Sequence, residues 1–364
     1  MHHIETCRTA VLGGHLDVCD TCGHTAVSYN SCRDRHCPKC QCLRQARWVT
    51  ARMERVLPTP HFHVVFTVPQ ELKPLALGNR ARFFEILFAA AVRTLLALGR
   101  DPRRLGGRLG ITAVLHTWSR TLAFHPHLHC IVTGGGLAPD GTRWISAPCR
   151  SRFLFPVKVV ARLFRGKLLT ALARARRCGQ LQFAGPCAHL ADPATFARLI
   201  ADLFGKDWVV YCKPPFGGAQ QVFRYLGRYT HRVGISNQRL IALDEGGVTF
   251  ATKNGERATL HPDEFIRRFL LHVLPAGFVK IRHFGLLAPA HVNGALAQAR
   301  GLLEPAASHP APQSSAPAAS EGGWRRLFLD LTGIDLTRCR ACGRGILIRH
   351  PLPIASLAPA FDTS

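Results

Sequence analysis

Three stretches of the chain have the run of apolar residues that is typical of buried strands. Residues 62–68 are almost continuously apolar between two prolines, and residues 111–118 form a second such run. Residues 125–132 continue the pattern, but histidines interrupt it at alternate positions, and the run ends at the glycines of residues 134–136. The short connection between the second and third runs predicts an antiparallel hairpin.

Helical spacing of apolar residues appears in three longer stretches. Residues 71–99 and 151–177 carry leucine, phenylalanine, valine and alanine at that spacing, and residues 220–233 lie between glycine-rich breaks that favour helix ends. We therefore expect an α+β domain with a central antiparallel sheet, the histidine strand inside it and helix 220–233 packed across one face. Further strands are expected at residues 208–212 and 247–252.

The strand expected at residues 125–132, here the histidine strand, carries two histidines on one face. Residues two apart in a strand point the same way, so His127 and His129 share a face while Leu128 and Cys130 turn toward the core. Two imidazoles on one face of a rigid element make half of a metal site. The hairpin brings His116 toward the same face. The alternative is a pair of exposed histidines on an amphipathic strand.

The helix at residues 220–233 carries two tyrosines four residues apart. Tyr225 and Tyr229 therefore stack on one face, where the phenols can act as nucleophiles. Arg224, Arg228 and Arg232 repeat the same period one position earlier and form a row of cations suited to DNA phosphates. The alternative is that the tyrosines belong to an apolar stripe and are core residues.

Residues 7–42 hold seven cysteines and three histidines among turn residues. Such a segment has little room for an apolar core, so we expect a metal to hold it together. Fourteen residues separate two Cys-x-x-Cys motifs, which is close to the spacing of paired zinc knuckles. This spacing predicts one tetrahedral structural zinc held by Cys19, Cys22, Cys37 and Cys40.

A second zinc site is a further hypothesis for the same segment. The alternative is that Cys32 is simply buried and that His36 contacts phosphate. The residues available for the second zinc are Cys7, His15, Cys32 and His36.

Charge points to a polyanionic partner. The chain has 47 Lys and Arg residues against 22 Asp and Glu residues, a formal net charge of +25.

The N-terminus lacks the apolar region of a secretory signal, and the longest apolar region, about residues 86–98, is too short to span a bilayer. We expect a cytoplasmic protein without a membrane partner, in which fourteen cysteines indicate metal thiolates and buried thiols instead of disulfides.

The composition suggests four regions. Near the C-terminus Cys339 and Cys342 form half of another knuckle, but only His350 is nearby as a third ligand, so the sequence favours a segment without zinc. The expected regions are a zinc-binding module at residues 1–47, a larger α+β domain at 48–300, a linker rich in Pro, Ala and Ser at 301–323, and a C-terminal segment with a single Cys-x-x-Cys at 324–364.

Taken together, these motifs resemble the two-tyrosine rolling-circle transposases of bacterial insertion sequences, the insertion-sequence-ninety-one family of the HUH endonuclease superfamily. The resemblance runs from about Cys7 to His291. It rests on the motifs at residues 29–32, 35–40, 115–118, 125–129, 134–136, 225–232 and 235–237.

The resemblance implies an HUH-type central antiparallel sheet flanked by helices and a divalent cation, Mg²⁺ or Mn²⁺, on His127 and His129. HUH nucleases add a third ligand, and we expect His116 because of the predicted hairpin; Gln221 and His231 are the alternatives. His125 shares the face but precedes a proline, so we expect it to be a neighbour of the site.

The resemblance also implies the reaction. Tyr225 and Tyr229 would attack the scissile phosphate of single-stranded DNA at element termini and targets, giving a 5′-phosphotyrosine and a 3′-hydroxyl. Such a protein acts at the bacterial nucleoid. Members of the family carry an additional segment ahead of the cysteines, so we expect this chain to be a truncated or internally started copy.

Two other classes of protein share some of these features. A non-catalytic zinc-dependent DNA-binding protein, or a decayed transposase, would explain the charge and the cysteines. A rolling-circle replication initiator or relaxase would use the same chemistry at a replication origin.

Overall fold

The computed structural model describes residues 2–147, 153–213, 234–252, 255–304, 328–329 and 334–353. The chain divides into two compact units. The larger unit comprises Arg52–Leu226 and Ile241–Ser308, and the smaller unit comprises Met1–Ala51, Gly227–Leu240 and His309–Ser364. The two ends of the chain therefore fold into one unit. The limits of the four regions expected from the sequence remain predictions.

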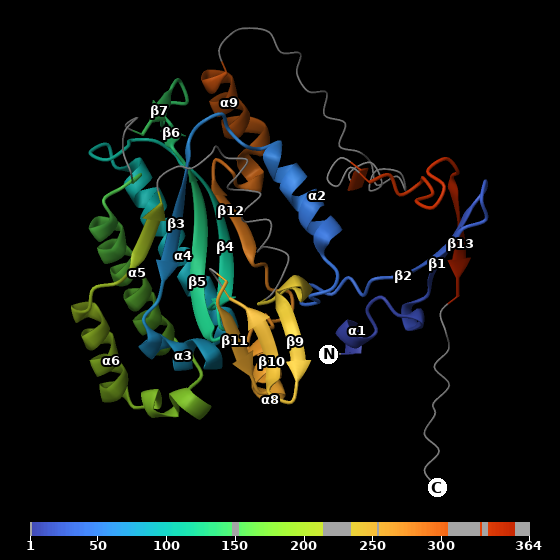
Figure 1. Cartoon of the computed structure of the whole chain (residues 1–364). Coiled ribbons are helices and arrows are strands. Elements are labelled where there is room, and N and C mark those ends of the chain that lie inside the picture. Colours follow the sequence, from blue (N-terminus) through green and yellow to red (C-terminus); the bar gives the residue numbers. More distant parts are fainter. Residues whose placement is uncertain are drawn as a thin grey trace. The chain divides into compact units, whose positions relative to one another are not determined.

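A five-stranded sheet forms the centre of the larger unit (Figure 1). All of its neighbouring strands are antiparallel. The α+β class with a central antiparallel sheet is thus confirmed. The strands, in their order across the sheet, are β12 (Ile281–Gly285), β4 (Gly110–Trp118), β5 (Phe124–Thr133), β3 (His61–Thr67) and β8 (Val210–Lys213).

Strands β4 and β5 form the predicted hairpin at the middle of this sheet. Their register places His116 directly opposite His127, and Leu115 opposite Leu128. Eight of the nine residues of β4 are buried, as its nearly continuous apolar run requires. The pairing shifts between His116 and Trp118, close to the turn of the hairpin.

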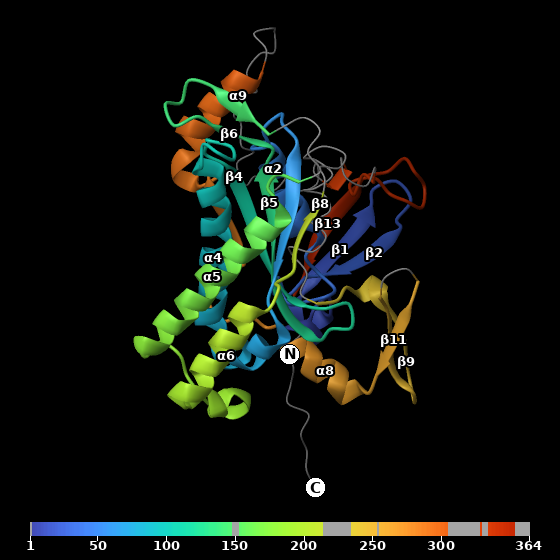
Figure 2. The same cartoon turned by 90° about the vertical axis from the view of Figure 1, so that its left-hand side faces the viewer.

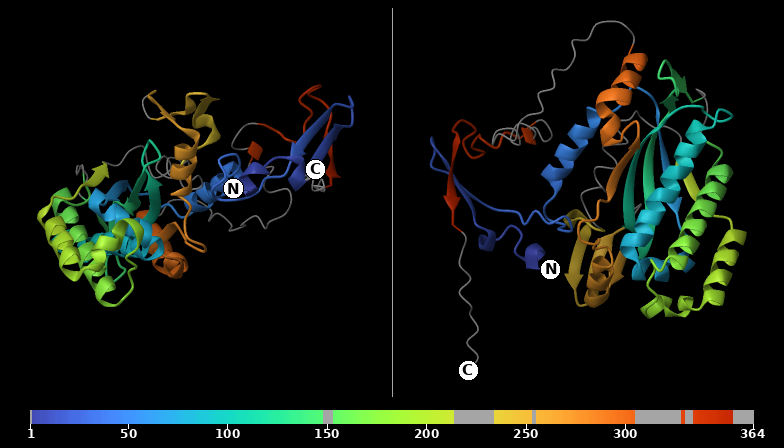
Figure 3. Two further views of the ribbon diagram at one scale, coloured as in Figure 1. Left: turned by 90° about the horizontal axis from the view of Figure 1, so that it is seen from below. Right: turned by 180° about the vertical axis from the view of Figure 1, so that it is seen from behind.

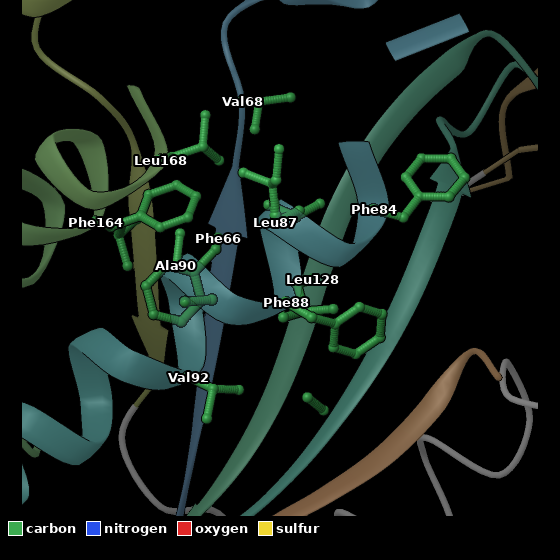
Figure 4. Close-up of a cluster of buried hydrophobic side chains, with 14 of the residues drawn as sticks. Phe66, Val68, Phe84, Leu87, Phe88, Ala90, Val92, Leu128, Phe164 and Leu168 are labelled. Atoms are coloured by element: carbon green, nitrogen blue, oxygen red, sulfur yellow. The ribbon is translucent and has the colours of Figure 1, made fainter. Parts of the chain in front are cut away.

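Helices α4 (Arg80–Arg100) and α5 (Val157–Arg177) pack side by side over one face of the sheet (Figures 2 and 3). Their apolar sides join the inward residues of β3 and β5 in one hydrophobic core (Figure 4). Phe66 of β3 and Phe164 of α5 are both fully buried, with ring centroids 4.8 Å apart. Helices α3 (Lys73–Gly78) and α6 (Pro193–Gly205) complete this layer.

The helical stretch expected at residues 71–99 is interrupted at Asn79. Its backbone leaves the helical region, with φ −131° and ψ 40°, between α3 and α4. The Asn79 side chain donates to the carbonyl of Gln182 at 2.8 Å and accepts from the Gln182 N–H at 2.7 Å. These bonds replace helical ones, because asparagine competes with the helix for backbone partners.

The remaining elements of the larger unit form two small sheets and short helical turns. A three-stranded sheet has the order β11-β10-β9, and β6 pairs with β7. The bounds are β6 (Gly135–Leu137), β7 (Trp144–Ser146), β9 (Leu240–Asp244), β10 (Gly247–Ala251), β11 (Arg257–Leu260), α8 (Pro262–Leu270), α9 (Ala297–Leu303), a π-helical turn (Val292–Leu296) and 3₁₀ turns at Gln70–Leu72, Gly185–Ala191 and Pro289–His291. The 3₁₀ turn at Asn237–Arg239 belongs to the smaller unit.

A three-stranded antiparallel sheet organises the smaller unit. Its order is β13-β1-β2, so a C-terminal strand pairs with the first strand of the chain (Figure 1). The elements are α1 (His2–Glu5), a 3₁₀ turn (Ala10–Leu12), β1 (Gly14–Cys19), β2 (Thr25–Tyr29), α2 (Cys42–Met53) and β13 (Leu347–Leu352).

Within the part of the chain that the structure describes, none of the helices combines the length and the apolar composition that crossing a bilayer requires. The helix expected at residues 220–233 lies outside the described residues.

The packing of α5 on the sheet predicts the effect of truncating its central aromatic side chain. Phe164→Ala should lower the free energy of unfolding by about 3–5 kcal/mol, because it leaves a cavity against Phe66. Leu163→Ala, at a side chain that is 38% exposed on the same helix, should cost less than about 1 kcal/mol. Urea denaturation measures both, and equal losses would contradict this helix–sheet packing.

Candidate active site and metal centres

Three histidines from β4 and β5 meet on the sheet face opposite α4 and α5. One ring nitrogen from each of His116, His127 and His129 lies within 4.8 Å of the other two. The alternation of β5 explains this placement, because Leu128 and Cys130 are fully buried in the core on the other side. The structure therefore brings the three residues expected as ligands into one cluster, which we call the histidine cluster.

Hydrogen bonds orient two of the three rings. His127 Nδ1 lies 2.7 Å from the carbonyl oxygen of His125 and donates to it. His129 Nδ1 lies 2.8 Å from Nε2 of His63 on the neighbouring strand β3. With Nδ1 engaged in both rings, Nε2 is the nitrogen left to coordinate a cation, which is the arrangement that metal-binding histidines commonly show. His125 contributes its backbone and is outside the cluster, as expected.

Burial keeps the cluster neutral at physiological pH. It lowers the pKa of His127 to about 4 and holds the pKa of His116 and His129 well below the usual range, and neighbouring imidazoles add to the effect at His116 and His129. Lys213 also lowers the pKa of His129 by charge repulsion. A neutral imidazole has a lone pair for a metal ion, so these rings are in the form that binds a cation.

His63, Lys213 and Lys280 also lie near this site, although none of them was expected there from the sequence. His63 interrupts the apolar run of β3 just as His127 interrupts β5, so the same signal was present. The lysines carry no such signal, because only the sheet order places them near the cluster. Lys280 Nζ lies 5.6 Å from the ring centre of Trp118, which stacks on His116 at 4.6 Å.

The four cysteines expected to hold one zinc do not meet. Cys19 and Cys22 lie at the tip of the β1–β2 hairpin, whereas Cys37 and Cys40 lie near its base. About five residue pairs of hairpin, roughly 15 Å, separate tip from base. The expected ligand set is therefore wrong, because spacing in sequence cannot reveal a hairpin that separates two neighbouring motifs.

The base of the hairpin gathers a four-cysteine group, here the base group. The Sγ atoms of Cys32 and Cys40 are 3.7 Å apart, and the Cys32 N–H points to Cys7 Sγ at 3.5 Å. The second zinc set expected from the sequence is corrected in the same way. His36 lies beside the Asp34 carboxylate and His15 lies on β1, both outside the group. The members are Cys7, Cys32, Cys37 and Cys40.

The tip of the hairpin meets the C-terminal Cys-x-x-Cys in a second group, here the tip group. Cys19 Sγ is 3.8 Å from Cys342 Sγ, and Cys22 Sγ is 3.8 Å from Cys339 Sγ. Backbone N–H groups of the turn after Cys342 lower the pKa of this thiol to about 6. Four ligands for the C-terminal motif could not be found from the sequence alone, because the missing pair lies at the other end of the chain.

The candidate nucleophiles and their neighbours lie outside the described residues, so their roles remain predictions. They are Tyr225 and Tyr229, the arginines Arg224, Arg228 and Arg232, and the alternative ligands Gln221 and His231.

Two family models match the chain. The model described as "Putative transposase" matches residues 110–294, which include the histidine cluster. The model described as "Transposase zinc-binding domain" matches residues 1–68, which include the whole base group and the N-terminal half of the tip group.

Two proteins resemble the chain over most of its length. "Putative transposase y4qJ" of Sinorhizobium fredii (strain NBRC 101917 / NGR234) is 48% identical over 354 residues, which cover 96% of this chain and 87% of that protein. The transposase for insertion sequence element IS801 of Pseudomonas savastanoi pv. phaseolicola is 30% identical over 350 residues, covering 93% and 79%. No solved structure matches the chain.

Burial of the histidines predicts a steep loss of stability in acid. Burial lowers the pKa of His61, His63, His127 and His272 to about 4, so the unfolded chain binds protons first. The protein with its structural zinc in place and no divalent cation added should be fully stable near pH 7 and lose stability as the pH falls from about 6.5 to 4, by on the order of 3 kcal/mol for each histidine.

Denaturant midpoints across this pH range measure the loss. His272→Gln should flatten the profile, because this buried imidazole bonds to the Leu122 carbonyl and to Thr117. His189→Gln, at an exposed position, is the matched control and should leave it unchanged. A profile that is flat in the unmodified protein would contradict the prediction.

Proposed function

This chain belongs to the insertion-sequence-ninety-one family of transposases, and from that premise we propose that it nicks and transfers single-stranded DNA at the ends of its own element by a rolling-circle mechanism. The observation that carries the proposal is the histidine cluster, three neutral imidazoles on a rigid hairpin in the part of the chain that the transposase model matches. A transposase acts on DNA, which agrees with the net charge of +25.

The histidine cluster fits a divalent cation. His116, His127 and His129 would be its ligands, and the bonds to His63 and to the His125 carbonyl leave Nε2 of two of the rings for it. Mg²⁺ or Mn²⁺ bound there would polarise the scissile phosphate and offset the charge that develops in the transition state. Three protein ligands leave room for phosphate and water oxygens, which both ions favour.

Positive side chains around the cluster would hold the DNA backbone. Lys213 and Lys280 lie close enough to the imidazoles to lower their pKa by charge repulsion. Both side chains therefore add positive potential where a phosphate would sit. Arg224, Arg228 and Arg232 would extend this surface along the helix that carries the tyrosines.

Tyr225 and Tyr229 would be the nucleophiles. The phenolic oxygen of one tyrosine attacks phosphorus, and a new O–P bond forms as the bond from phosphorus to the 3′ oxygen breaks. The phenolic proton ends on the departing 3′-hydroxyl, and the DNA 5′ end stays on the protein as a phosphotyrosine. Attack of a 3′-hydroxyl on this linkage reverses the exchange, so strands rejoin without another energy source.

The remaining regions would support this reaction. Residues 1–47 would act as a zinc-dependent DNA-docking module that recognises element ends, and residues 48–300 would form the catalytic domain. The site of action would be the bacterial nucleoid, where the element and its targets lie.

The tyrosine assignment predicts a covalent adduct. Incubation with a labelled single-stranded element end and Mn²⁺ should give a protein–DNA species that survives denaturant, because the phosphotyrosine bond is covalent. Tyr225→Phe combined with Tyr229→Phe should abolish it, and Tyr211→Phe, at an exposed tyrosine of β8, is the matched control. An adduct formed equally well by the double variant would refute the assignment. Binding without any adduct would favour the non-catalytic DNA-binding protein.

The bond between His63 and His129 predicts a positioning role. His63→Ala should weaken Mn²⁺ binding by about 10–100-fold, because His129 loses the partner that orients its ring. His63→Gln, which keeps a polar atom near the Nε2 position, should restore part of the affinity.

The matched control for this experiment is His61→Gln. His61 lies on the same strand but bonds to the Thr59 carbonyl, so this change should leave Mn²⁺ affinity unchanged. Calorimetric titration of the protein with Mn²⁺ measures all variants. Equal losses in the variants at both histidines would show a general effect of strand stability and contradict the positioning role.

A further inference from the structure

The two halves of the tip group have the same local backbone. Each is a Cys-x-x-Cys-Gly turn, and Gly23 and Gly343 have φ of 67° and 68°. In each turn this glycine N–H donates to the carbonyl of the first cysteine, at 3.1 Å to Cys19 and 3.0 Å to Cys339. Turns of this kind point both thiols to one side, as zinc knuckles do.

Backbone N–H groups surround the sulfurs in both halves. Thr21 N–H and Cys22 N–H point to Cys19 Sγ at 3.4 and 3.5 Å. Gly345 N–H points to Cys342 Sγ at 3.3 Å. Such donors stabilise thiolates, which are the form of cysteine that binds metal.

The sulfur distances fit a tetrahedral ion and exclude a disulfide. Disulfide sulfurs lie about 2.05 Å apart, whereas the two sulfur–sulfur distances between the halves of the tip group are each 3.8 Å. Four sulfurs at about 2.3 Å from a central Zn²⁺ lie about 3.8 Å from one another. The tip group therefore has the dimensions of a tetrathiolate zinc site.

Contacts outside the sulfurs hold the two halves in register. Strands β1 and β13 pair along their length, and Arg349 forms a two-pronged ion pair with the buried carboxylate of Asp17, at 2.7 and 2.9 Å. Asp20 Oδ1 accepts from the Ile346 N–H at 2.9 Å. The backbone at residue 345 lies so close to Cys19 that this position requires glycine, because an added Cβ would overlap Cys19 Sγ.

We propose that the tip group is a second structural zinc site whose ligands come from opposite ends of the chain. The paired cysteines are 323 and 317 residues apart in sequence, so this zinc makes the C-terminal segment an integral half of the N-terminal zinc-binding module. Closing so long a loop removes much conformational freedom from the unfolded chain. The inference does not depend on the nicking reaction, because it concerns metal content alone.

Zinc content of cysteine-pair variants tests the proposal. The unmodified protein should contain two zinc ions per chain, by elemental analysis and native mass spectrometry. Serine at Cys339 and Cys342 should remove one ion, and serine at Cys19 and Cys22 should also remove one. Combining these two changes should still remove only one, because all four thiols serve the same ion.

Combining serine substitutions in the tip group with serine substitutions in the base group should remove two ions instead of one. Serine at Cys19, Cys22, Cys37 and Cys40 should remove both ions, since it damages both groups. Cys178→Ser, at an exposed cysteine outside either group, is the control and should keep two. Two ions retained without Cys339 and Cys342, or iron in place of zinc, would overturn the proposal.

A matched pair of single changes tests the close approach with every cysteine left in place. Gly345→Ala should speed chelator-induced release of one of the two zinc ions by about tenfold or more, because the new Cβ displaces Cys19 Sγ. Arg344→Ala, at the exposed neighbouring residue, should leave both release rates unchanged. Equal release rates from the Gly345 variant and the unmodified protein would overturn the proposed contact.

Discussion

The register between β4 and β5 is the constraint on which the larger unit depends. Leu115 faces Leu128 on the core side, and one residue further along each strand His116 faces His127 on the other side. Since side chains alternate along a strand, a slip of one residue would put imidazoles into the core and leucines at the site. The core under α4 and α5 therefore stabilises the histidine cluster by forbidding any other register.

Burial of the cluster has two consequences that oppose each other. It keeps the imidazoles neutral, and a neutral imidazole can act as a ligand. It also lowers the stability of the fold at acidic pH, because the unfolded chain binds protons more readily than the folded one. His63 and the His125 carbonyl reduce the freedom of two rings, so little ordering would remain when a cation binds. A site of this kind is stable when neutral and would gain further stability from a cation bound there.

Strand length decides how the cysteines are grouped. The β1–β2 hairpin puts one Cys-x-x-Cys at its tip and leaves Cys7 and Cys32 at its base. Each of these cysteine pairs therefore needs a second pair from another segment to make a four-cysteine group. Cys37 and Cys40 complete the base group locally. The tip group is completed only by the strand β13, which joins the sheet from the far end of the chain. Elements distant in sequence thus become one module through a shared sheet.

The hairpin and the three histidines on one of its faces could be predicted from the sequence, because alternation and apolar runs are local signals and the two strands are close together in the chain. The cysteine-rich N-terminal segment could likewise be predicted to be zinc-binding, and the motifs sufficed to identify the family. Which thiols meet depends on the folded chain, since a hairpin separates neighbouring motifs and a sheet joins remote ones. The partnership of His63 with His129 and the nearby lysines likewise follows from strand order, which no local pattern encodes.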